Sequence, residues 1–123
     1  MRMLVIEDDV DVREMITKIL KDEGYDVAEA NNGVEGIKYL KDASEIDCIV
    51  TDLIMPEKEG IETIIDVKRD YPNIKILAIS GGGKGNAQNY LHIAKAMGAD
   101  LTLSKPFIKK ELIDAIQQLI VTS

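Results

Sequence analysis

Five short apolar segments rich in Val and Ile alternate with segments of helical spacing along the whole sequence. The apolar segments are residues 3–6, 25–29, 48–50, 74–79 and 100–103. Apolar runs bounded by turn residues are typical of parallel strands that are buried on both faces. Between them, one helix face is clearest in Val12, Met15, Ile16, Ile19 and Leu20. This alternation predicts an α/β domain in which helices cover both faces of a five-stranded parallel sheet.

The length of the chain fits a single domain. It has 123 residues, 46% of them hydrophobic, and no Ser- or Pro-rich linker interrupts the alternation. Gly24 and Gly98 fall where helices are expected to end, and Pro72 prevents a helix from continuing past Tyr71. We therefore expect residues 1–123 to form one domain.

Charge and composition exclude several classes of protein. The chain carries 15 basic and 22 acidic residues, a net charge of −7, without a basic stripe. Direct binding of nucleic acid is therefore not expected, because neutralising phosphates requires clustered Lys and Arg. No apolar run approaches the roughly 18 residues that span a bilayer, and the amino terminus does not resemble a signal peptide, which predicts a cytoplasmic protein. Cys48 is the only cysteine, so a small buried core residue is expected there.

Polar side chains follow four of the predicted strands. In parallel sheets of this kind, binding sites form beyond the carboxyl ends of the strands, where the strand order reverses. Asp9 is suited to cap the following helix. Capping does not explain Asp52, because helical spacing resumes only after Pro56 and Gly60. The residues in question are Glu7, Asp8, Asp9, Asp52, Ser80 and Lys105.

Four motifs at these strand ends carry a family resemblance. They are Val5-Ile6-Glu7-Asp8-Asp9, Asp52-Leu53-Ile54-Met55-Pro56, Ser80-Gly81 and Lys105-Pro106-Phe107. In this order and spacing they resemble the receiver domains of two-component response regulators, over essentially the whole chain. The resemblance implies a doubly wound (βα)5 fold with strand order 2-1-3-4-5.

In that strand order the first and third strands are neighbours, so Glu7, Asp8 and Asp52 converge. Two carboxylates about 4 Å apart repel by roughly 4 kcal/mol at an effective dielectric of about 20, which favours a bound cation. An all-oxygen site favours Mg²⁺. We expect Asp8, Asp52 and the main-chain carbonyl of Ile54 to be direct ligands, and Glu7 to bind through water.

The resemblance also implies the chemistry of the site. Asp52 is the expected nucleophile and phosphoryl acceptor, Lys105 the expected neutralising ammonium, and Ser80 the expected hydroxyl donor to the phosphoryl group. The Lys105–Pro106 peptide bond should be cis. A switch of this kind catalyses only its own phosphorylation and dephosphorylation. Expected partners are a sensor histidine kinase or phosphotransfer protein and an output protein or domain, with the chain a monomer or weak homodimer.

The sequence departs from the family at two places. Thr102 occupies the position, three residues before Lys105, where the family usually has an aromatic ring coupled to the switch hydroxyl. The loop Gly81-Gly82-Gly83-Lys84-Gly85 is rich in glycine and is expected to be mobile, although it does not match a P-loop. Tyr90 is a possible substitute ring, and His92 is expected to be structural or to face a partner.

Three alternative functions compete with this interpretation. A haloacid dehalogenase phosphatase requires Asp-x-Asp-x-Thr/Val after the first strand, but here Asp9-Val10-Asp11-Val12 is followed by Arg13. A flavodoxin-like carrier of FMN requires hydroxyls and amides in its first loop, where this chain has three acids. A docking domain that has kept the fold without phosphorylation is the third alternative, and the presence of all four site motifs argues against it.

Overall fold

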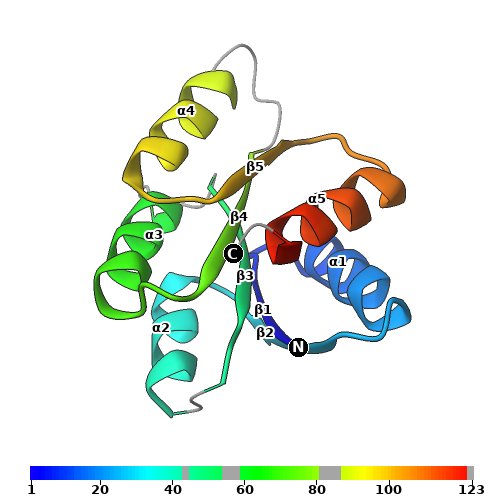
Figure 1. The fold of residues 1–123 in the computed structure, drawn as a ribbon, viewed down its shortest axis with the longest axis horizontal. Helices are drawn as coiled ribbons and strands as arrows, with labels where there is room; N and C mark the ends of the chain where they lie inside the picture. The colour runs from blue at the N-terminus through cyan, green and yellow to red at the C-terminus, as the bar shows by residue number, and fades with distance from the viewer. Residues whose placement is uncertain (43–44, 54–58, 81–86, 122–123) are drawn as a thin grey trace.

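Five parallel strands form a single sheet in the order β2-β1-β3-β4-β5, which confirms the predicted topology (Figure 1). The computed structural model describes residues 1–42, 45–53, 59–80 and 87–121, with the backbone alone for residues 59 and 87–91. The strands are β1 (Arg2–Ile6), β2 (Asp26–Ala30), β3 (Cys48–Asp52), β4 (Lys75–Ser80) and β5 (Leu101–Ser104). The helices are α1 (Val10–Asp22), α2 (Gly33–Asp42), α3 (Glu59–Asp70), α4 (Ala87–Met97) and α5 (Lys109–Val121).

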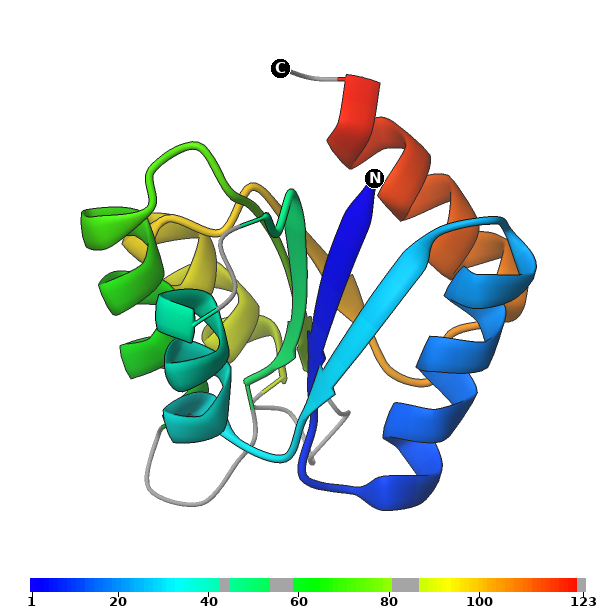
Figure 2. The same cartoon turned by 90° about the horizontal axis from the view of Figure 1, so that it is seen from below.

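The helices cover the two faces of the sheet unequally. Figures 1 and 2 show α1 and α5 on one face and α2, α3 and α4 on the other. Since successive side chains of a strand point to opposite faces, each strand contributes to two separate apolar layers. Met3 and Val5 pack with the α1 and α5 residues Ile16, Leu20 and Leu112.

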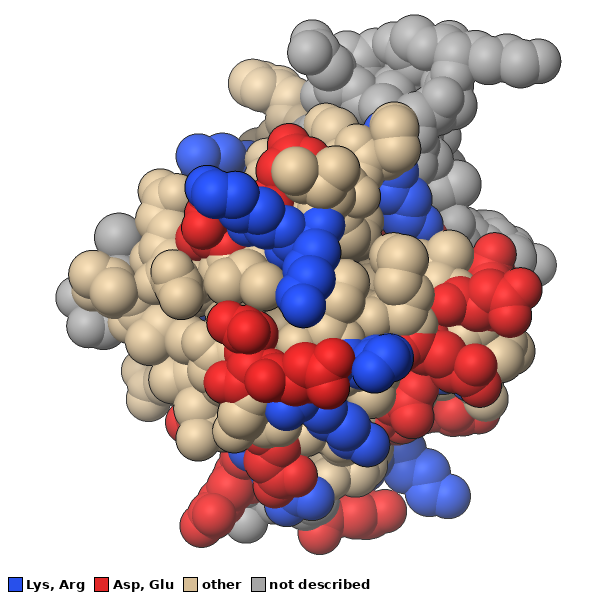
Figure 3. All heavy atoms as spheres, turned by 90° about the vertical axis from the view of Figure 1, so that its right-hand side faces the viewer, with Lys and Arg blue, Asp and Glu red and all other residues tan. Residues whose placement is uncertain are grey.

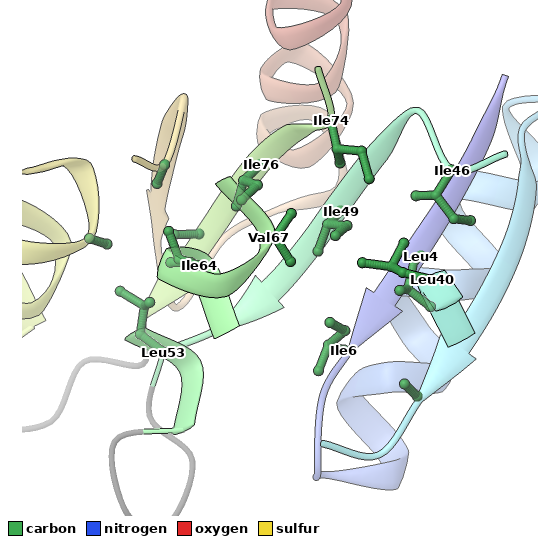
Figure 4. Packing of buried hydrophobic residues seen from close by; sticks show 14 residues of the cluster. Leu4, Ile6, Leu40, Ile46, Ile49, Leu53, Ile64, Val67, Ile74 and Ile76 are labelled. Carbon is green, nitrogen blue, oxygen red and sulfur yellow. The ribbon is translucent and has the colours of Figure 1, made fainter. Parts of the chain in front are cut away.

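The opposite layer joins the central strands to α2 and α3. Leu4 and Ile6 of β1 lie near Leu40 of α2, and Ile49 and Ile76 lie near Ile64 and Val67 of α3 (Figure 4). Both layers are almost entirely aliphatic, as expected for a chain with 4% aromatic residues. Because the central strands are buried on both faces, their sequences are continuous apolar runs and do not alternate between apolar and polar residues.

The helices begin and end at the capping and turn residues that the sequence predicts. Asp9 caps α1, and its Oδ1 accepts hydrogen bonds from the backbone N–H groups of Asp11 at 2.9 Å and Val12 at 3.2 Å. Gly24 and Gly98 have φ values of +92° and +125°, the left-handed region in which glycine meets no Cβ penalty. Helix α3 ends at Asp70, two residues before Pro72.

A half-buried lysine links a helix to the amino-terminal ends of two strands. Lys68 of α3 donates to the carbonyl oxygen of Ile74 at 2.8 Å and pairs with Asp100 Oδ2, also at 2.8 Å. The same Asp100 oxygen accepts the backbone N–H of Ile76 at 2.9 Å. The pair therefore ties α3 to the starts of β4 and β5, at the end of the sheet opposite the acidic residues.

The face of the molecule that α1 and α5 form has mixed charge. On the side formed by α1 and α5, Lys and Arg side chains are interspersed with Asp and Glu, and no continuous basic stripe is visible (Figure 3). Within the described residues, none of the helices combines the length and the apolar character that crossing a bilayer requires.

Candidate functional site

The predicted site residues lie at the carboxyl ends of the strands, which point toward the same edge of the sheet (Figure 2). Glu7 directly follows β1, and Lys105 directly follows β5. Asp52 and Ser80 are the last residues of β3 and β4 rather than the first residues beyond them. This one-residue difference leaves their positions at the edge of the sheet unchanged.

Lys105 bridges two buried carboxylates. Its Nζ lies 3.0 Å from Glu7 Oε1 and 3.2 Å from Asp52 Oδ2. The Glu7 and Asp52 side chains are only 2% and 7% exposed, whereas the Lys105 side chain is 23% exposed. The ammonium thus neutralises charge that water does not reach, and it does so from the open side of the site.

The pKa values of Glu7 and Lys105 are shifted from their ordinary values. Burial, together with the hydrogen bond and charge of the neighbouring Asp52, raises the pKa of Glu7 to about 8 despite the opposing effect of Lys105. Burial by itself would lower the pKa of Lys105, but the hydrogen bond to Glu7 and the charges of both carboxylates outweigh it and raise that pKa. In the metal-free protein, Glu7 therefore takes up a proton more readily than an ordinary glutamate, and Lys105 keeps its proton more firmly than an ordinary lysine.

The raised pKa of Glu7 predicts that the metal-free protein loses stability as pH rises. The folded protein binds the Glu7 proton more tightly than the unfolded chain does. The stabilisation that comes from this proton is therefore complete below pH 4.5 and is lost by about pH 8. The slope contributed by one proton is at most about 1.4 kcal/mol per pH unit. The free energy of unfolding, measured by urea denaturation between pH 4.5 and pH 8 in the presence of a chelator, gives this slope.

Glu7→Gln should remove this part of the pH dependence, because the amide does not titrate. The exposed residue Glu14 on α1 provides a matched control, and Glu14→Gln should leave the slope unchanged. A Glu7→Gln variant whose stability falls with pH as steeply as that of the wild type would contradict the assignment.

Three carboxylates from the tips of adjacent strands could hold a metal ion. Oxygen atoms of Glu7, Asp8 and Asp52 all lie within 4.8 Å of one another. Asp8 is exposed, and none of the described residues forms a hydrogen bond or ion pair with its carboxylate. Hard oxygen donors with one side open to solvent suit Mg²⁺, which keeps several of its waters. The donor set therefore fits the cation that the sequence predicts.

Ser80 is completely buried beside this cluster. Asp52 pairs in register with Ile79, the residue before Ser80, and the Ser80 carbonyl accepts the backbone N–H of Lys105 at 2.8 Å. Among the described residues, the Ser80 hydroxyl has no hydrogen-bond partner. Leaving a buried hydroxyl without a partner costs about 1–3 kcal/mol, so this group is available for a hydrogen bond to a bound ligand.

Several other sequence predictions concern the surroundings of the site. The Lys105–Pro106 peptide bond is cis, as predicted. Thr102 lies in β5 opposite Ala78 and is half-buried, and His92 is exposed on α4. Ile54, the predicted carbonyl ligand, and the loop of residues 81–85 lie outside the described residues, as does the Tyr90 side chain.

Two features of the site were not predicted from the sequence. The direct contact between Lys105 and Glu7 joins residues 98 positions apart, and no sequence pattern indicated it. Arg13 donates to the carbonyl oxygen of Glu7 at 2.9 Å and approaches Glu29 Oε1 at 3.3 Å. An arginine six residues after an acid has no distinctive spacing, so no sequence pattern indicated this contact.

Many known proteins match this chain in sequence, and many solved structures match it in fold. The family model described as the response regulator receiver domain matches residues 3–117. The chemotaxis protein CheY of Listeria monocytogenes is 30% identical over 119 residues, which cover 96% of this chain and 97% of CheY. A CpxR homolog described as a transcriptional regulatory protein, from Haemophilus influenzae, is also 30% identical over 97% of this chain.

The structural comparison agrees with the sequence comparison. The crystal structure of the receiver domain of NtrX from Brucella abortus superposes with a TM-score of 0.89 at 26% identity, covering 98% of this chain and 99% of that domain. The chain spans only about half of the CpxR homolog, at 50% of its length, but nearly all of CheY. The chain belongs to the receiver domain family of two-component response regulators.

Proposed function

We propose that residues 1–123 act as one phosphoacceptor switch, in which Asp52 receives a phosphoryl group in a reaction that requires Mg²⁺. The observation that carries the proposal is the position of Lys105, whose ammonium contacts both buried carboxylates, Glu7 and Asp52. Asp8 lies close enough to complete an acidic pocket with them. A nucleophile, a cation pocket and a neutralising ammonium are the groups that phosphoryl transfer to a carboxylate requires.

In the proposed reaction, an Asp52 carboxylate oxygen forms a bond to phosphorus as the bond between phosphorus and the donor's leaving group breaks. The electron pair of that bond departs with the leaving group, and Asp52 becomes an acyl phosphate. Mg²⁺, when bound by Asp8, Asp52 and the Ile54 carbonyl, supplies positive charge to the phosphoryl oxygens. Lys105 supplies the second positive charge from its position beside Asp52 Oδ2.

Ser80 is the proposed sensor of the phosphoryl group, because its buried hydroxyl has no partner among the described residues. A hydrogen bond to a charged group contributes about 1.5–3 kcal/mol. Shifting a two-state equilibrium from about 1:99 to 99:1 requires about 5.5 kcal/mol. Ser80 and Lys105 must therefore share the coupling between phosphorylation and conformation.

Ser80→Ala is expected to give a partial response to phosphorylation, intermediate between no change and the wild-type change. Amide chemical-shift changes recorded with and without phosphorylation measure this fraction. Ser104 is the exposed register partner of Ser80, and Ser104→Ala should respond as the wild type does. A full response in Ser80→Ala would contradict the proposal that Ser80 contributes to the coupling together with Lys105.

The proposed partners are a sensor histidine kinase or phosphotransfer protein as donor and an output protein or domain as target. Support comes from relatives alone, among them a sensor kinase named CckA and a transcriptional regulatory protein named as a CpxR homolog. Consistent with a switch rather than an enzyme for external substrates, we expect turnover to be limited to the chain's own acyl phosphate.

Transfer from a purified histidine-phosphorylated donor tests the proposed function as a whole. The phosphoryl group should move to this chain with Mg²⁺ present, and the amide spectrum should change at the carboxyl ends of β3, β4 and β5. Transfer without a spectral change would leave an acceptor that does not switch. Absence of transfer from both protein and small-molecule donors would favour a docking domain that has kept the fold.

A further inference from the structure

Arg13 is the basic residue of α1 that reaches the acidic pocket. Its Nη1 donates to the main-chain carbonyl oxygen of Glu7 at 2.9 Å, and its side chain is only 14% exposed. The backbone N–H of Glu7 donates in turn to the carbonyl oxygen of Ala30 at 3.1 Å. The backbone of Glu7 is therefore held on both sides, by β2 through its N–H and by Arg13 through its carbonyl.

The carbonyl of Glu7 belongs to the peptide unit that leads into Asp8. Because a peptide unit is planar, the orientation of this carbonyl also sets the positions of the N and Cα atoms of Asp8. The Asp8 carboxylate is exposed and receives no hydrogen bond or ion pair from any described residue. Its place in the pocket thus depends on its backbone, and Arg13 restrains that backbone.

Glu29 holds Arg13 in position. Its Oε1 lies 3.3 Å from Arg13 Nε, while the other end of the guanidinium contacts Glu7. Glu29 lies on β2 in register with Val5 of β1, so it is fixed by the sheet. Its negative charge also offsets that of the guanidinium, which would otherwise oppose a cation bound nearby.

We propose that Arg13, held by Glu29, is a positioning residue that sets the cation affinity of the pocket by fixing the Glu7–Asp8 peptide. The inference rests on the proposed function, because it concerns the site that would hold Mg²⁺. Arg13 touches neither the phosphoryl group nor the cation. Its contribution is to order Asp8 before the cation arrives, so that binding does not have to restrain this segment.

Calorimetric titration of the unphosphorylated protein with Mg²⁺ alone tests this inference. Arg13→Ala is expected to weaken Mg²⁺ binding roughly tenfold, the lower end of the range for groups that orient metal ligands. Removing a positive charge would by itself strengthen binding, so the sign of the change separates positioning from simple electrostatics. Amide hydrogen exchange at Glu7, whose N–H donates to the Ala30 carbonyl, should become faster in the same variant.

Arg69 provides a matched control, since this exposed arginine of α3 pairs only with Asp66 and Asp70 among the described residues. Arg69→Ala should leave Mg²⁺ affinity within twofold of the wild type. If Arg13→Ala does not fold, Glu29→Gln tests the same inference, because releasing the guanidinium from its ion pair should speed amide hydrogen exchange at Glu7, which the lost charge alone would not do.

Unchanged or tighter Mg²⁺ binding in folded Arg13→Ala would overturn the positioning role and leave Arg13 as a structural residue. That result differs from failure of the proposed function, in which the wild type itself would not bind Mg²⁺. Weaker binding with faster exchange at Glu7 in Arg13→Ala, and wild-type behaviour in Arg69→Ala, would support the inference.

Discussion

Lys105→Met is expected to slow Mg²⁺-dependent phosphorylation of Asp52 on the order of 100-fold, because it removes a preorganised positive charge from the site of transfer. The ammonium lies 3.2 Å from Asp52 Oδ2, the carboxylate that is proposed to accept the phosphoryl group. The same change leaves Glu7 and Asp52 without this counter-ion. Mg²⁺ should consequently raise the melting temperature of Lys105→Met by more than it raises that of the wild type.

Lys68→Met is the matched control for this prediction. The Lys68 side chain is 21% exposed, close to the 23% of Lys105, and pairs with Asp100 at the opposite end of the sheet. Its loss should lower the melting temperature because it leaves Asp100 without its ion pair, while the phosphorylation rate should stay within about twofold of the wild type. A wild-type rate in Lys105→Met would contradict the role assigned to Lys105.

Gly60→Ala is expected to destabilise the protein and to impair the site at the same time. A Cβ at Gly60 would lie 2.5 Å from the carbonyl oxygen of Asp52 and 2.7 Å from the Cα of Leu53. Backbone atoms cannot move aside cheaply, so we expect a loss of about 1–3 kcal/mol in the free energy of unfolding. The displaced Asp52 should also accept a phosphoryl group more slowly.

Gly36→Ala separates this effect from the general consequence of adding a methyl group to a helix. A Cβ at Gly36 would lie 2.5 Å from Cδ1 of Ile6, the end of a side chain that can change rotamer. Its stability loss should be the smaller of the two, with phosphorylation at the wild-type rate. Chemical denaturation and a phosphorylation time course on both variants provide the comparison. Equal effects in the two variants would show that the contact at Asp52 has no special importance.

The fold was predictable because its determinants are local. The apolar runs, the Asp9 cap and the glycines at residues 24 and 98 each act within a few residues of their position in the chain. Parallel strands linked by helices then leave few topologies. The residues at the strand tips converge as a consequence of that topology, which is why Glu7 and Asp52 were predicted to meet.

The contacts that were missed depend on side-chain reach rather than on topology. Lys105 was expected to neutralise a phosphoryl group on Asp52, whereas its contact with Glu7 depends on the length of the Glu7 side chain and on both rotamers. Arg13 reaches the Glu7 carbonyl from α1 and meets Glu29 from β2, and neither contact leaves a periodic pattern. The close packing of Gly60 on Asp52 likewise depends on where α3 begins, which apolar spacing does not fix.

The intact mass of the protein after incubation with acetyl phosphate tests the central claim most directly. With Mg²⁺, the wild type should gain the mass of one phosphoryl group, and with a chelator it should gain none. Asp52→Asn should gain none under either condition, because an amide cannot form the acyl phosphate. Asp9→Asn, which changes the cap of α1 rather than the pocket, should behave as the wild type does. A Mg²⁺-dependent gain that persists in Asp52→Asn would contradict the assignment of Asp52 as the phosphoryl acceptor.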